Sequence, residues 1–62
     1  MQFLVCTFDG GDKVHIVLGN VAYFYQDGIR TRFEFIGKAP GQWVTETVAE
    51  IVAMITKGKP KS

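Results

Sequence analysis

The sequence contains very little cysteine and histidine, and this scarcity limits the chemistry that the chain can carry. Cys6 and His15 are single residues of their kind among 62. One cysteine cannot form an intramolecular disulfide, and together with one histidine it falls short of the four ligands of a structural zinc site. We therefore expect no disulfide and no metal, as is typical of proteins in a reducing compartment.

Long hydrophobic runs and an excess of one charge are also absent. No apolar stretch approaches the roughly 18 residues that a membrane-spanning helix needs. Residues 1–6 carry no basic segment of the kind that begins a signal peptide, and Asp9 follows soon after. The net charge of +1 neither requires nor forbids a polyanionic partner. These features predict a cytoplasmic protein with no membrane role.

The chain does have enough apolar residues for one small core. Hydrophobic residues make up 47% of it and charged residues 21%, the balance of a folded protein. A chain of this length buries only about 60% of its unfolded surface, which leaves no room for two cores. We predict a single α+β domain over residues 1–57 and a basic, flexible tail over residues 58–62.

Four runs rich in β-branched and aromatic residues alternate with turn sequences, which predicts strands. The runs are residues 2–8, 14–18, 21–25 and 29–36. The turns between them are Asp9-Gly10-Gly11-Asp12, Gly19-Asn20 and Gln26-Asp27-Gly28. The Asp-Gly pair is the strongest signal for a tight hairpin, and Gln42-Trp43-Val44 is a candidate for a short fifth strand.

The period of the hydrophobic pattern changes near residue 48 from two to that of a helix. Ile29, Thr31, Phe33 and Phe35 alternate with Arg30, Arg32 and Glu34, whereas Val48, Ile51, Val52 and Ile55 form one helical stripe. Thr47 and Glu50 fit a capping box at the start of the helix. The sequence thus predicts an α+β fold, in which an antiparallel sheet of four to five strands is followed by one C-terminal helix packed on one face.

No set of residues in the sequence indicates catalysis. Cys6 and His15 are the one pair of cysteine nucleophile and histidine base, but no Asn or Asp is placed to orient the histidine, so we interpret both as strand residues. Asp9 and Asp12 offer too few oxygens for calcium and suit a turn better. We predict that the protein is not an enzyme and has no cofactor and no small-molecule substrate.

Two sets of side chains indicate binding of a macromolecule. Tyr23 and Tyr25 share one face of their strand, and Arg30 and Arg32 share one face of the next. If the two faces coincide, they form a platform for a protein partner or for stacked single-stranded nucleic acid. A solvated strand face is the competing interpretation. Candidate polyanion contacts are Lys57, Lys59 and Lys61.

The strands also predict self-association, because both of their faces are apolar. One helix covers one face of a sheet, so the other face, with Phe3, Val5 and Tyr23 as candidate contact residues, is left for a homodimer. Alternatively, the loop around Pro40 and Trp43 folds back as a lid. Our prediction is a non-enzymatic protein-interaction module, a homo-oligomeric regulatory or accessory protein. The alternative is a nucleic-acid-binding regulator that uses the Arg/Tyr face and the lysine tail.

A resemblance to known proteins rests on three segments: residues 7–10, residues 18–21 and residues 44–51. In these segments the chain resembles the small flagellar-operon proteins of the FlbD-like family, and more distantly the β-rich LytTR type of domain. Thr7-Phe8-Asp9-Gly10 is similar to that family's Thr-Arg-Leu-Asn-Gly turn, and Leu18-Gly19-Asn20-Val21 stands where the family has Leu-Asn before a strand. Residues 44–51, with Ile55 after them, resemble its Val-x-Glu-Ser-x-x-Glu-Val and closing apolar helix. The resemblance implies the same order of strands and helix. A small phage or plasmid accessory protein of similar build remains an equal alternative.

Overall fold

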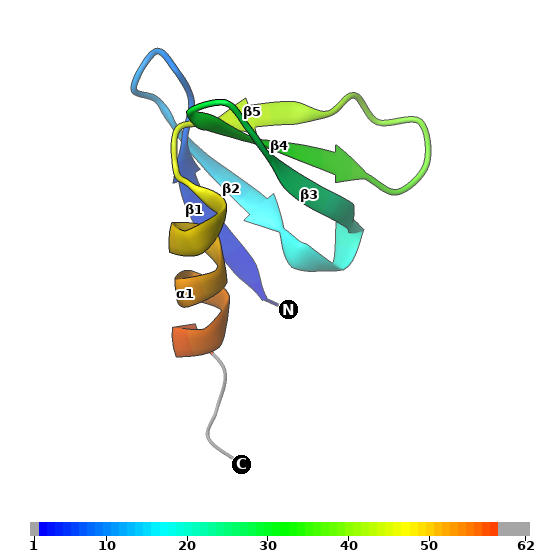
Figure 1. Cartoon of the computed structure of the whole chain (residues 1–62). Coiled ribbons are helices and arrows are strands. Elements are labelled where there is room, and N and C mark those ends of the chain that lie inside the picture. Colours follow the sequence, from blue (N-terminus) through cyan, green and yellow to red (C-terminus); the bar gives the residue numbers. More distant parts are fainter. Residues whose placement is uncertain (1, 59–62) are drawn as a thin grey trace.

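Five β-strands and one α-helix follow one another along residues 2–58, the part of the chain that the computed structural model describes (Figure 1). In order they are β1 (Phe3–Thr7), β2 (Lys13–Val17), the 3-10 turn η1 (Leu18–Asn20), β3 (Val21–Asp27), β4 (Arg30–Phe35), β5 (Gln42–Val44) and α1 (Val48–Gly58). The α+β class, the antiparallel pairing and the C-terminal helix are as predicted, and the segment around Trp43 forms the fifth strand.

The strands lie in two sheets and not in the single sheet that the sequence predicted. β1 pairs with β2, and β3, β4 and β5 form a second sheet in that order. The reason is local: Gly19 and Asn20, predicted to form a turn between paired strands, lie in η1, and neither has a positive φ. The 3-10 turn redirects the chain, so β3 starts a new sheet instead of pairing with β2 (Figure 1).

The hairpin between β3 and β4 forms where the Asp-Gly pair predicted it, but its two-residue loop is Gly28-Ile29 and not Gln26-Asp27-Gly28. Asp27 pairs with Arg30, and Gly28 has a φ of 62° while Ile29 does not have a positive φ. A positive φ at only the first loop residue fits a type II′ turn, which matches the twist of the strands. Ile29, predicted on the apolar face of the strand, lies in this loop and is 87% exposed.

A register shift in β3 changes which of its side chains face the core. The pairing with β4 is irregular between Val21 and Tyr23, so Val21 lies opposite Phe35 while Tyr23 lies opposite Glu34. Val21 was predicted to share a face with Tyr23, but it packs against the core. An extra residue in one strand reverses the alternation of side chains beyond it, and sequence alternation alone does not reveal it.

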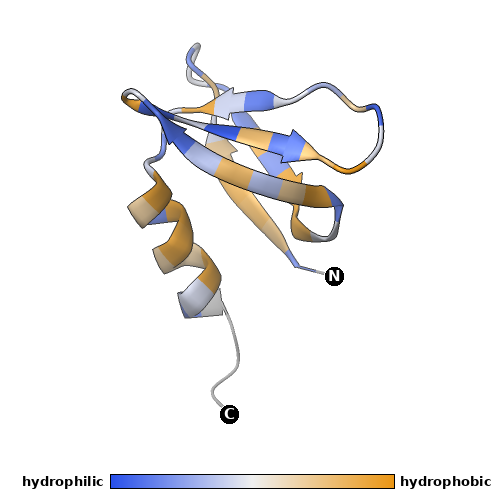
Figure 2. Ribbon diagram, turned by 45° about the vertical axis from the view of Figure 1, so that its right-hand side comes forward, coloured by the Kyte–Doolittle hydropathy of each residue, from blue (hydrophilic) through white to orange (hydrophobic). Residues whose placement is uncertain are grey.

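The hydrophobic core lies between the two sheets and α1. Its buried hydrophobic residues come from both sheets and the helix: Leu4, Cys6, Ile16, Phe33, Val44 and Ile51. The alternation of hydrophobic and hydrophilic residues along β4 is visible in Figure 2, and its hydrophobic side faces this core. Each sheet therefore covers part of the apolar face of the other.

The helix contacts β1 and β3, one strand from each sheet, rather than covering one face of a single sheet. Its capping box forms as predicted: the Thr47 N–H donates to Glu50 Oε1 (2.8 Å), and the Glu50 N–H donates to Thr47 Oγ1 (3.1 Å). Ile51 is fully buried, but Val52, predicted in the same stripe, is 48% exposed. Met54 packs against the core instead, because the buried stripe is centred on Ile51 and continues three and four residues later.

Candidate functional site

The outer face of the three-stranded sheet brings the predicted tyrosine and arginine pairs together. Tyr25 lies opposite Arg32, which in turn lies opposite Trp43. Residues directly opposite each other on antiparallel strands point to the same face. We call this surface the arginine–aromatic face, and its residues are Tyr23, Tyr25, Arg30, Arg32 and Trp43.

Trp43 occupies the centre of the contacts on this face. The guanidinium carbon of Arg32 lies 4.3 Å from the centroid of the Trp43 ring, and that of Arg30 lies 4.8 Å from it. The indole N–H donates to Asp27 Oδ2 at 3.0 Å. Cation–π contacts and a hydrogen bond thus fix a ring that is still 41% exposed. A side chain held in this way loses little freedom on binding a partner.

The sequence did not single out Trp43 as a binding residue. It was predicted as part of a short fifth strand or of a lid over the second face of the sheet, and it lies on the outer face of its own sheet against Arg32. The signal that finds it is the alternation in Gln42-Trp43-Val44, combined with antiparallel pairing of this short strand with β4. Once Val44 is assigned to the core, Trp43 must share the face of the arginines.

Two tyrosines extend the face onto β3. The rings of Tyr23 and Tyr25 are stacked with centroids 6.2 Å apart and an interplanar angle of 24°. Tyr23 is 60% exposed and Tyr25 46%. These rings are therefore available to a partner over an edge of the sheet, while Phe24, which lies between them in sequence, packs against the core.

The arginines of this face are already paired with carboxylates. Arg30 Nη1 lies 3.0 Å from Asp9 Oδ2, and Arg32 Nε lies 2.8 Å from Glu34 Oε2. With Asp27 on the Trp43 indole, three carboxylates stand beside two guanidiniums. The face consequently carries no net positive charge, which favours a partner with mixed polar groups over a polyanion.

A half-buried polar clasp joins β1 to the segment between β5 and α1. Glu46 accepts hydrogen bonds from the backbone N–H and the hydroxyl of Thr7 (2.9 and 2.8 Å), and the Thr45 N–H donates to the Thr7 carbonyl (2.8 Å). The Thr31 hydroxyl donates to the Glu46 carbonyl (2.7 Å). The clasp therefore links both sheets at the point where the chain enters the helix.

The Glu46 carboxylate is tuned to stay ionised. Burial raises its pKa, but hydrogen bonds from Thr7 and from its own backbone N–H, together with the nearby charge of Lys13, lower the pKa more, so that it lies below its usual value of 4.5. No local pattern in the sequence singles out Glu46. Its bond to Thr7, 39 positions away, was beyond the reach of local sequence patterns.

The candidate self-association residues do not form one surface. Phe3 and Val5 lie on the outer face of the β1–β2 sheet, 51% and 44% exposed, and the Phe3 ring lies 5.5 Å from that of His15. Tyr23 belongs to the other sheet. The single uncovered sheet face that the sequence predicted therefore does not exist. Phe3 and Val5 lie on the outer face of the β1–β2 sheet, and Tyr23 lies on the arginine–aromatic face of the other sheet.

Cys6 and His15 are on opposite sides of the β1–β2 sheet. Cys6 is fully buried and pairs with Val14, whereas His15 pairs with Val5 on the exposed side. Burial first, and then the charge of Glu46, raise the pKa of the Cys6 thiol to about 11, although Lys13 acts the other way. The thiol is therefore neutral at pH 7. Cys6 packs in the core, as its place in an apolar strand indicated.

The remaining candidates lie at or beyond the end of the helix. Lys57 is exposed in the last turn of α1, while Lys59 and Lys61 fall outside the described residues. In residues 2–58, no cluster of three or more His, Cys, Asp or Glu side chains is arranged to hold a metal ion. Within the same residues, no helix, α1 included, is long and apolar enough to cross a membrane.

Comparison with family models, with curated proteins and with solved structures found no match to the chain. The resemblance to the FlbD-like family stays a prediction from the residue pattern.

Proposed function

We propose that the protein is a non-enzymatic module that binds another protein through the arginine–aromatic face. The observation that supports this most is the arrangement around Trp43, a partly exposed ring fixed by Arg30, Arg32 and Asp27. Trp, Tyr and Arg are the residue types most enriched where a few side chains carry most of the binding energy. A regulatory or accessory role in the cytoplasm fits a small domain whose single cysteine has no partner for an intramolecular disulfide.

Nucleic acid is the second candidate partner, and the stacked, exposed rings of Tyr23 and Tyr25 are the observation in its favour. Aromatic side chains on a sheet can stack against unpaired bases. Such binding also needs positive charge along the phosphate backbone, whereas both arginines here are paired with acids. Protein is therefore the better-supported partner.

The test compares two exposed aromatic residues on different sheets. Wild-type protein, Trp43→Ala and Phe3→Ala are immobilised and used to capture proteins from a lysate of the native host. Proteins that the wild type and Phe3→Ala retain, but Trp43→Ala does not, are purified and titrated against each variant. We expect Trp43→Ala to weaken the affinity about 30-fold, the effect of a 2 kcal/mol hot spot. Equal affinity of wild type and Trp43→Ala for every retained protein contradicts the proposal.

A parallel titration with a fluorescent single-stranded oligonucleotide addresses the second candidate. Affinity that falls steeply between 50 and 200 mM salt, roughly in proportion to the number of phosphate contacts, and that is lost in Arg32→Ala, favours nucleic acid as the partner. Weak binding with no dependence on Arg32 favours protein. Arg32→Lys separates charge from stacking geometry, because lysine keeps the charge but not the planar guanidinium.

A further inference from the structure

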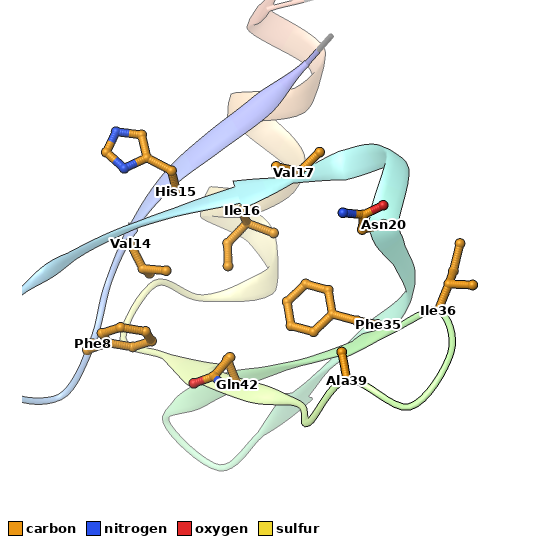
Figure 3. Close-up of a pocket in the computed structure, with 10 residues that line it drawn as sticks. All are labelled: Phe8, Val14, His15, Ile16, Val17, Asn20, Phe35, Ile36, Ala39 and Gln42. Carbon is orange, nitrogen blue, oxygen red and sulfur yellow. The ribbon is translucent and has the colours of Figure 1, made fainter.

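A groove of about 490 Å³ remains open between β2 and the second sheet (Figure 3). It exists because β2 pairs only with β1, so the two sheets do not join along this side. Figure 3 shows the side chains of Val14, Ile16 and Phe35 directed into the space from β2 and β4. The floor of the groove is therefore hydrophobic and continuous with the core, since Ile16 is a core residue.

Polar groups of the described residues line the groove alongside the apolar side chains, and none of them belongs to an acidic side chain, a lysine or an arginine. The side-chain amides of Asn20, from η1, and Gln42, from β5, border it on different sides (Figure 3). An amide can both donate and accept hydrogen bonds. Among the described residues that line the groove there is no Asp, Glu, Lys or Arg, and the His15 ring points away from the space.

We propose that this groove binds a neutral small ligand that has an apolar body and also carries hydrogen-bonding groups. Its volume lies within the range of roughly 300–1,000 Å³ that is usual for small-molecule sites, and its lining combines apolar side chains with polar groups that can fix the orientation of a ligand. A charged ligand would lose its hydration without meeting an opposite charge, which is costly. Asn20 and Gln42 select for ligands with a hydroxyl, carbonyl or amide group.

The dimensions favour a small ligand over a protein partner. A protein interface of standard size involves about 20–30 residues a side, whereas ten residues line the groove. Ala39, from the loop between β4 and β5, narrows the space opposite β2 (Figure 3). No residue of the arginine–aromatic face lines the groove, so this proposal is independent of the proposed function.

The first test uses N-phenyl-1-naphthylamine, a neutral probe whose fluorescence rises in apolar surroundings. We expect saturable binding of one probe per chain. Ala39→Trp places a bulky ring in the groove and should weaken this binding at least tenfold, while Lys38→Trp, the same addition at the neighbouring exposed position, should change it less than twofold. Equal effects of the two variants, or binding that does not saturate, overturn the proposal.

The second test asks where the probe binds and whether charge matters, and it needs only the wild-type protein. On titration, the methyl NMR signals of Val14, Ile16 and Ala39 should shift, while that of Ile29 at the hairpin tip should not. 8-Anilinonaphthalene-1-sulfonate has the same aromatic body with an added sulfonate, and we expect it to bind at least tenfold more weakly. Shifts confined to other residues, or equal affinity for the two probes, contradict the proposal. Groove signals that shift with protein concentration alone also contradict it, because they would place a second copy there.

Discussion

The outer faces of the two sheets are built from the same antiparallel pattern but are stabilised in different ways. On the three-stranded sheet, Trp43, Arg30 and Arg32 each have a hydrogen bond, an ion pair or a stacking contact. On the two-stranded sheet, Phe3 and Val5 are exposed and only Phe3 has a ring contact, with His15. Fixed polar and aromatic groups suit specific recognition, whereas a bare apolar strand face suits burial against a similar face.

The comparison depends on both sheets sharing one core, and Ile51 is the residue that tests this most directly. It is fully buried between the sheets, so Ile51→Ala should lower the free energy of unfolding by about 2–5 kcal/mol. Val52→Ala, one position along and half exposed, should change it by less than about 0.5 kcal/mol. Urea unfolding followed by circular dichroism measures both. A similar small decrease in the free energy of unfolding in both variants would show that α1 does not hold the sheets together.

We predict that a homodimer forms through the outer face of the β1–β2 sheet, where Phe3 and Val5 are exposed, and not through the arginine–aromatic face. Phe3→Asp should weaken dimerisation at least tenfold, about 1.4 kcal/mol, because it buries a charge in the interface. Tyr23→Asp, on the other sheet, should leave the dimer unchanged. Light scattering over a concentration series gives the mass of each variant. Dissociation by Tyr23→Asp and not by Phe3→Asp would assign the interface to the opposite sheet, and a strictly monomeric wild type would remove the dimer altogether.

The hydrogen bonds of Glu46 make the stability of the fold depend on pH. Because the folded-state pKa of Glu46 lies below its usual value, the clasp contributes its full stability above that usual value of 4.5 and loses it as the pH falls through the folded-state pKa. Glu46→Gln should cost about 1 kcal/mol at pH 7, roughly the difference between a hydrogen bond to a charged acceptor and one to a neutral acceptor. It should also flatten the pH dependence of unfolding below pH 5. An unchanged dependence would show that other carboxyls control acid unfolding.

The smallest expected effect concerns the contacts within the arginine–aromatic face. Arg32→Met keeps much of the packing of the side-chain stem but removes the charge, so it should destabilise the fold by about 0.5–1 kcal/mol. Arg30→Met, with a longer distance to the ring and an exposed ion pair to Asp9, should cost less than that. Thermal unfolding of both single variants and of each combined with Trp43→Leu isolates the pairwise terms. Costs that persist in the Trp43→Leu background would show that the ring contact is not their source.

Local features of this fold were predictable from sequence, and features set by backbone geometry were not. The Asp27-Gly28 hairpin and the Thr47–Glu50 capping box follow from residue type alone, and alternation along β4 identified its two faces. The 3-10 turn at Gly19 and the irregular register at Val21 have no comparable signature, and together they decide that there are two sheets. The candidate site shows the same division, since alternation alone found the tyrosines and arginines, whereas Trp43 also requires the pairing of β5 with β4.

The clasp between Thr7 and Glu46 also has a consequence for the time course of folding. The β3–β4 hairpin closes over two residues and can form in about 1–10 μs. Thr7 and Glu46 are separated by 39 positions, so bringing them together costs far more chain entropy and must wait until other contacts have shortened the intervening chain. If the clasp forms after the rate-limiting step, its loss speeds unfolding and leaves the folding rate nearly unchanged. The bond that joins the two sheets then governs how long the native state lasts rather than how fast it is reached.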